Sequence, residues 1–140
     1  MTLDQKQQEI IDEFAIYDDW MDKYEYLIDL GKDLPVINTS YKKDENLING
    51  CQSKVWLHAE FFENKVSFSA DSEAIITKGI IALLIRVLNH QNPKDIIEAK
   101  LNFINDIGLT NHLSPTRANG LLEMVKQMKA YAFTLNIKNN

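Results

Sequence analysis

The sequence has little cysteine, proline or glycine: its 140 residues include one cysteine, Cys51, with 3 prolines and 5 glycines. One cysteine excludes an internal disulfide and fits a reducing compartment such as the cytosol. So few glycines and prolines, together with 45% hydrophobic residues, exclude collagen-like repeats and a disordered chain. At 16.1 kDa we expect a single domain over residues 1–140.

Long apolar runs and basic clusters are also missing. The longest strongly apolar run, Gly79 to Ile85, is far shorter than the roughly 20 residues that a membrane span needs. The N-terminus lacks the basic and then apolar pattern of a secretory signal. The net charge of −5, without a basic block, argues against nucleic-acid binding. We therefore expect a cytoplasmic protein without a membrane or nucleic-acid partner.

Metal and nucleotide motifs are absent as well. One cysteine and 3 scattered histidines give no zinc-ligand spacing. No glycine-rich phosphate-binding motif occurs in the sequence. We expect no metal site and no nucleotide chemistry.

The first third of the chain has the apolar periodicity of two helices. One pattern centres on Ile10 and Phe14, and the other runs from Trp20 to Ile28. Gly31 is expected to end the second helix, because glycine accepts the left-handed conformation common just past a helix end. The polar stretch 38–46 has no period and is expected to be a surface loop.

The middle of the chain has the alternating pattern of strands. Residues 55–61 and 66–70 alternate between two faces, and Glu63-Asn64 can join them as an antiparallel hairpin. Leu47-Ile48 is expected to add a short third strand, with Asn49-Gly50 as the tight turn that follows it.

Three helices are predicted for the remainder. The first, over residues 75–88, is apolar on two sides and could be capped by Asp71 or Ser72. The second begins at an Asn-Pro pair and spans 92–108, and the last begins at a Ser-Pro pair with Ser114 as its cap. This block order predicts an α+β fold, with about three antiparallel strands and helices packed on one face.

Cys51 is expected between a tight turn and a strand, where its sulfur is presented at a loop. A free cysteine is often a small buried hydrophobe. The alternative is a nucleophilic thiolate, which needs partial access and a positive or dipolar neighbour. Both interpretations fit the residues alone.

Arg117 is expected near the third residue of the last helix, where a cation is locally unfavourable by roughly 0.3–1 kcal/mol. An ion pair or an exposed side chain would explain it, and so would an anion-facing role beside free helix N–H groups. His112 and His58 could serve Cys51 as a base, although both also fit as packed or hydrogen-bonding residues.

Residues 50–56, GCQSKVW, resemble the GCQSxVW signature of the SufE family, the sulfur acceptors of cysteine desulfurases. The agreement continues through residues 71–74, 78–82, 109–117 and 120–121 and covers nearly the whole chain. The resemblance implies a curved antiparallel sheet with helices packed on it, a fold shared with IscU-type scaffolds.

The resemblance also implies a function in iron–sulfur cluster assembly. Cys51 would take sulfane sulfur as a persulfide from a PLP-dependent, SufS-type cysteine desulfurase, stimulate that enzyme and pass the sulfur to a scaffold. PLP would belong to the partner, so we expect no cofactor on this chain and no autonomous turnover. Whether the free protein is a monomer or a homodimer is left open.

Individual roles follow from the same resemblance. Arg117 and His112 are expected near the sulfur, where they would stabilise a developing anion. Gln52 and Ser53 would shape the loop, and Gly50 and Glu73 would belong to the loop or to the partner-binding surface. Two rival functions remain: a non-catalytic adaptor that only activates a desulfurase, and a cysteine hydrolase that uses a histidine base.

Overall fold

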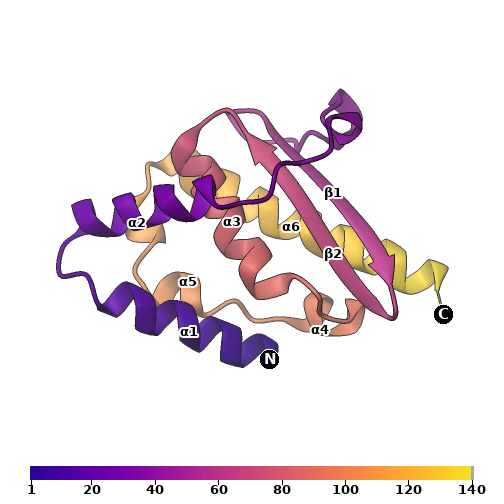
Figure 1. Cartoon of the computed structure of the whole chain (residues 1–140), viewed down its shortest axis with the longest axis horizontal. Coiled ribbons are helices and arrows are strands. Elements are labelled where there is room, and N and C mark those ends of the chain that lie inside the picture. Colours follow the sequence, from indigo (N-terminus) through magenta and orange to yellow (C-terminus); the bar gives the residue numbers. More distant parts are fainter. Residues whose placement is uncertain (140) are drawn as a thin grey trace.

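Helix α3 (Ile75–Leu88) lies in the middle of the fold, as its two apolar sides predict. In the computed structural model, which describes residues 1–139, most of its side chains are buried. Helix α2 (Trp20–Lys32) packs against α3, and so does the hairpin of β1 (Val55–Phe62) and β2 (Lys65–Ser72) (Figure 1). The mixed helix and antiparallel-strand architecture confirms the predicted α+β class.

The hairpin has the register that its alternating pattern requires. Val55 pairs with Ser72 at the open end, and Phe62 pairs with Lys65 at the turn. Glu63 and Asn64 form the connection, with φ angles of 50° and 64°. Positive φ at both positions suits a two-residue hairpin turn, because its twist matches that of the strands.

The predicted third strand is wrong, because the described sheet has two strands. Leu47 makes only an isolated bridge to Trp56, and the Ile48 N–H donates to the Val55 carbonyl at 2.9 Å. Asn49-Gly50 does form a turn, and Gly50 has a φ of 89°. The chain then leaves the sheet as a loop over residues 49–54, so pairing with β1 cannot extend.

Helices lie at both ends of the sequence. The two helices predicted for the first third of the chain and the last predicted helix are confirmed. Helix α6 starts at Pro115, and the Ser114 hydroxyl accepts from the Arg117 backbone N–H. The remaining elements are α1 (Leu3–Ala15), α4 (Pro93–Glu98), α5 (Phe103–Asp106), α6 (Pro115–Lys138) and the short 3-10 helices η1 (Thr39–Tyr41), η2 (Asp44–Asn46) and η3 (Thr110–His112).

The single helix predicted for residues 92–108 is instead two short helices, α4 and α5. Gln7 of α1 causes this break: its side-chain amide donates to the Lys100 carbonyl and accepts from the Phe103 N–H. These bonds replace hydrogen bonds that a continuous helix would make. Asn92 does cap α4 as predicted, accepting from the Asp95 N–H.

Neither predicted cap of α3 acts as one. The cap position is Ala74, and Asp71 and Ser72 complete β2. The Asp71 carboxylate instead pairs with Lys42 at 3.0 Å and with Lys78 at 3.3 Å. These ion pairs hold the carboxylate beside the sheet. Burial acts to raise the pKa of Asp71, but hydrogen bonds from Lys42, the Ser72 N–H and Lys78 outweigh it, so the pKa lies below its usual value.

Gly31 does not end α2, which continues through Lys32. It is buried where α2 crosses α3, opposite Gly79. A Cβ on Gly31 would lie 2.8 Å from the Gly79 nitrogen, and a Cβ on Gly79 would lie 2.4 Å from the Leu27 carbonyl oxygen. The two glycines therefore let the helices approach backbone to backbone.

We expect Gly79→Ala to lower the free energy of unfolding by about 1–3 kcal/mol, because the added methyl group meets backbone that cannot move away. Urea unfolding followed by circular dichroism measures the change. Gly120→Ala is the control: its Cβ would make an ordinary contact at 3.6 Å, so helix propensity should leave that variant as stable or up to about 1 kcal/mol more stable. An unchanged Gly79→Ala variant would contradict the close crossing.

Candidate functional site

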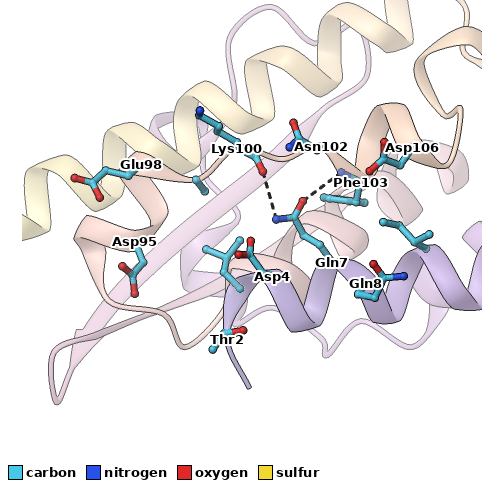
Figure 2. Close-up of a pocket in the computed structure, with 13 residues that line it drawn as sticks. Thr2, Asp4, Gln7, Gln8, Asp95, Glu98, Lys100, Asn102, Phe103 and Asp106 are labelled. Carbon is cyan, nitrogen blue, oxygen red and sulfur yellow. Dashed lines mark hydrogen bonds between the residues drawn. The ribbon is translucent and has the colours of Figure 1, made fainter.

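A cavity with a volume of about 660 Å³ lies between the start of α1 and the α4–α5 segment (Figure 2). Four carboxylates line it, from Asp4, Asp95, Glu98 and Asp106. Gln7 lies in its wall, with both amide atoms committed to the hydrogen bonds that separate α4 from α5. No cysteine or histidine contributes to this lining, so none of the predicted catalytic side chains lies in it.

A cavity of about 350 Å³ elsewhere contains Cys51. Its walls come from the 49–54 loop, the start of α3 and the first three turns of α6, so three segments distant in sequence meet here. The lining is mixed, with hydroxyl groups beside apolar side chains. The lining residues are Cys51, Gln52, Ser53, Ala74, Thr77, Ile80, Ser114, Thr116, Arg117, Gly120 and Met124.

Local sequence accounts for the position of Cys51. The turn at Asn49-Gly50 reverses the chain, and the bond between Ile48 and Val55 closes the base of the loop. Cys51 therefore follows a residue with positive φ and stands outside the hairpin ladder. Its side chain is half-buried, which agrees with the expected loop position and gives the sulfur partial access.

Helix α6 supplies the surface on which the sulfur lies. The Cys51 thiol donates to the Gly120 carbonyl across 3.7 Å, a long and weak contact. The sulfur lies directly against Gly120: a Cβ on this residue would lie 3.6 Å from Sγ, which is an ordinary van der Waals contact. The Asn119 side-chain amide also donates to the Gly50 carbonyl at 3.2 Å.

The electrostatic setting of the sulfur favours the neutral thiol. Burial raises the pKa of the Cys51 thiol above its usual value, and the negative charge of Glu123 raises it further. A thiol of this kind is less ionised at neutral pH than an ordinary cysteine. The resting site therefore keeps its nucleophile protonated.

Arg117 is the cationic side chain in the lining. It is exposed and belongs to the first turn of α6, where the Ser114 cap fixes the backbone. The guanidinium and the helix start both favour an anion. The structure thus brings Arg117 and Cys51 to one cavity, which the sequence predicted only as a hypothesis.

His112 does not line the Cys51 cavity. Its ring stacks on Trp20 with centroids 4.0 Å apart, and Nδ1 lies 2.9 Å from the Gly108 carbonyl oxygen. Its own carbonyl accepts from the Tyr24 hydroxyl. His112 is therefore held in the packing of η3 against α2.

The remaining predicted residues divide between the cavity and the surface. Gln52 and Ser53 line the cavity, and Gly50 provides the turn before Cys51. Glu73 is exposed at the β2–α3 junction and does not contribute to the lining. His58 stacks on Tyr41 at a centroid distance of 3.6 Å, on β1 and outside this lining.

Sequence reasoning missed Asn119 and Glu123 of α6 and Thr77 of α3. A glycine inside a helix was the available signal, because Gly120 lowers helix propensity without being a terminus. That signal marks a close approach but does not identify its neighbours on the helix. Over residues 1–139 there is no group of three or more His, Cys, Asp or Glu that could hold a metal ion.

Comparison with known proteins gives matches along most of the chain. The family model "SufE: Fe-S metabolism associated domain" matches residues 8–132. An uncharacterized SufE-like protein of Rhizobium meliloti is 38% identical over 130 residues, which cover 89% of this chain and 92% of the relative. An uncharacterized SufE-like protein of Synechocystis is 38% identical over 136 residues, which cover 96% of this chain and 86% of that relative.

A longer relative and a solved structure extend the comparison. SufE-like protein 1, chloroplastic/mitochondrial, of Arabidopsis thaliana is 39% identical over 134 residues, covering 95% of this chain but 36% of that protein. The solution structure of a hypothetical protein from Thermus thermophilus has a TM-score of 0.77 at 19% identity, covering 92% of this chain and 94% of that one. That structure supports the fold. In the described part of the chain, no helix is long and apolar enough to cross a membrane.

We expect Cys51 in the native chain to react with iodoacetamide only at higher pH than Cys51 in the urea-unfolded chain. The thiolate is the reactive form, and the raised pKa means that a given thiolate fraction is reached at a higher pH. Alkylation rates measured against pH by intact mass give the two midpoints. A native midpoint equal to or below the unfolded one would contradict the electrostatic description of the site.

Proposed function

Because this chain belongs to the SufE family, whose domain is associated with iron–sulfur metabolism, we propose that it is a covalent sulfur carrier. Cys51 receives sulfane sulfur from a PLP-dependent, SufS-type cysteine desulfurase, stimulates that enzyme and relays the sulfur for cluster assembly. One observation carries the proposal: the chain's single cysteine lies in a loop that closes against a cavity lined by a guanidinium and a helix start.

The transfer step is thiol–persulfide exchange. Cys51 loses its proton, and the thiolate attacks the outer sulfur of a persulfide on the desulfurase. A new S–S bond forms at Cys51 while the S–S bond of the donor breaks, and the donor cysteine leaves with the electron pair as a thiolate. No external oxidant or reductant is consumed.

The residues of the cavity fit the charges that develop during this step. A cysteine persulfide carries its outer sulfur as an anion, and Arg117 offers a cation at the cavity wall. The open space of about 350 Å³ beside Sγ is large enough for one more sulfur atom. Thr77 and Ser53 supply hydroxyl groups in the same walls.

A solitary cysteine also suits safe carriage. A second thiol nearby could attack the persulfide, form a disulfide and release sulfide. The single cysteine also argues against a scaffold that holds iron–sulfur clusters, since several cysteine thiolates hold such clusters. We therefore assign PLP to the donor and the assembling cluster to a downstream scaffold.

The proposed compartment is a reducing one such as the cytoplasm, because an unpaired thiol persists there. The name of the Arabidopsis relative assigns that protein to the chloroplast and mitochondrion. The lone cysteine is compatible with any compartment in which thiols stay reduced.

The lining of the Cys51 cavity argues against one of the two rival functions, the cysteine hydrolase, but not against the adaptor. A cysteine hydrolase needs a base within hydrogen-bond reach of the sulfur, and no histidine of residues 1–139 lines the Cys51 cavity. A non-catalytic adaptor remains a second candidate, because the exposed residues around the loop could bind a desulfurase without sulfur transfer.

Cys51→Ser should abolish sulfur uptake and leave the thermal unfolding curve nearly unchanged, because the half-buried side chain loses only one weak contact. Incubation with a desulfurase, PLP and cysteine, followed by intact-mass and peptide mass spectrometry, locates the added sulfur. The adaptor predicts that the serine variant still stimulates the desulfurase fully. Sulfur bound elsewhere, or full stimulation by that variant, would contradict the carrier.

Arg117→Ala should slow sulfur transfer by about tenfold, because a charge-assisted contact to the developing sulfur anion is lost. The matched control is Lys94→Ala, which removes a cation from the first turn of α4, another helix that starts with proline. Rapid-quench measurement of labelled sulfur on Cys51 gives both rates. Equal rates for the two variants would remove Arg117 from the site.

A further inference from the structure

Three residues of α6, Asn119, Gly120 and Glu123, contact the loop that carries Cys51. The Asn119 amide donates to the Gly50 carbonyl at 3.2 Å, and the Gly120 carbonyl faces the sulfur. Glu123 packs closely on Gly50: a Cβ added to Gly50 would lie 2.7 Å from the Glu123 Cγ. Asn119 and Glu123 are four residues apart, so they lie on one face of the helix.

Glu123 differs from the other two contacts because it brings a negative charge to the loop. The lining residues from the loop itself and from the start of α3 are uncharged. From α6, Arg117 lines the cavity and Glu123 lies against the turn. Lys126 is 3.5 Å from the Glu123 carboxylate but has 75% of its side chain exposed, so solvent weakens this pair.

Burial and the Glu123 carboxylate act in the same direction on the thiol: both raise the pKa of Cys51. Packing alone would hold the loop with any side chain of similar shape, whereas the charge opposes loss of the thiol proton. An uncharged residue at position 123 would give the same contact without this opposition.

We propose that Glu123 is a positioning residue that keeps the Gly50–Cys51 turn closed on α6 and sets a negative charge against the loop that carries the Cys51 sulfur. Its biological meaning rests on the sulfur-carrier function proposed above. The Glu123 side chain is 29% exposed, so a cationic group of a docked sulfur donor can reach it. Pairing with that cation removes the charge that opposes ionisation of Cys51.

The test uses the full chain and no sulfur donor. Alkylation of Cys51 by iodoacetamide is measured from neutral to alkaline pH for the wild type, Glu123→Gln and Glu123→Ala. Glu123→Gln keeps the shape and removes the charge, so its profile should shift to lower pH, with a rate at neutral pH about threefold to tenfold above wild type. Glu123→Ala also removes the contact and should react at least as fast.

The control carboxylate is Glu98, which lines the other large cavity and carries the same charge. Glu98→Gln should follow the wild-type profile. In urea all variants should react alike, because the folded contacts are gone. Circular dichroism confirms that each variant is folded before its native profile is measured.

Two outcomes would overturn the proposal. One is a Glu123→Gln profile that coincides with wild type or with Glu98→Gln. The other is a Glu123→Ala rate that rises equally at every pH without a shift of midpoint, which would show that Glu123 acts through packing alone.

Failure of the sulfur-carrier function gives a different signature. Cys51 would then take up no sulfur from a desulfurase in the wild-type chain, whatever the alkylation profiles of the variants show. The two assays therefore report separately on the proposed function and on Glu123.

Discussion

The crossing of α2 over α3 is the constraint on which the rest of the fold depends. Gly31 and Gly79 remove the side chains at the crossing point, so the two helices touch backbone to backbone. Because α3 is apolar on both sides, the hairpin and α6 cover faces that α2 leaves open. This arrangement brings the β2–α3 junction beside the first turns of α6, where the cavity around Cys51 lies.

Helix α6 contributes more to this site than any other element. Its capped start carries Arg117, the sulfur lies against its glycine, and its third turn carries Glu123. The cation and the carboxylate have opposite effects on a sulfur anion. A single rigid helix thus holds both the group that would favour the charged sulfur and the group that opposes it.

The sequence was sufficient where a local pattern determines the structure. Alternation before and after Glu63-Asn64 predicted the hairpin, and the Ser-Pro pair at 114 predicted the start of α6. The Asn-Gly turn before a strand placed Cys51 at a loop, and a cation at a helix start marked Arg117.

The sequence was insufficient where a distant residue decides the structure. Gly31 has the position of a helix end but is the contact with Gly79, which lies far along the chain. Gln7 breaks the helical pattern of residues 92–108 through hydrogen bonds across the fold. Glu123 is an ordinary surface acid in the helical pattern, and only the docking of α6 on the loop shows that it faces Gly50.

The half-buried, protonated sulfur of Cys51 affects how well the protein resists chemical damage while no partner is bound. Peroxides and other electrophiles attack the thiolate far more readily than the thiol, and over-oxidised forms of cysteine are irreversible. A side chain that stays neutral until it is needed is consumed slowly by such reagents. With no second cysteine to act as a reserve, irreversible over-oxidation of Cys51 would end the proposed carrier function, so chemical inertness at rest would set its working lifetime.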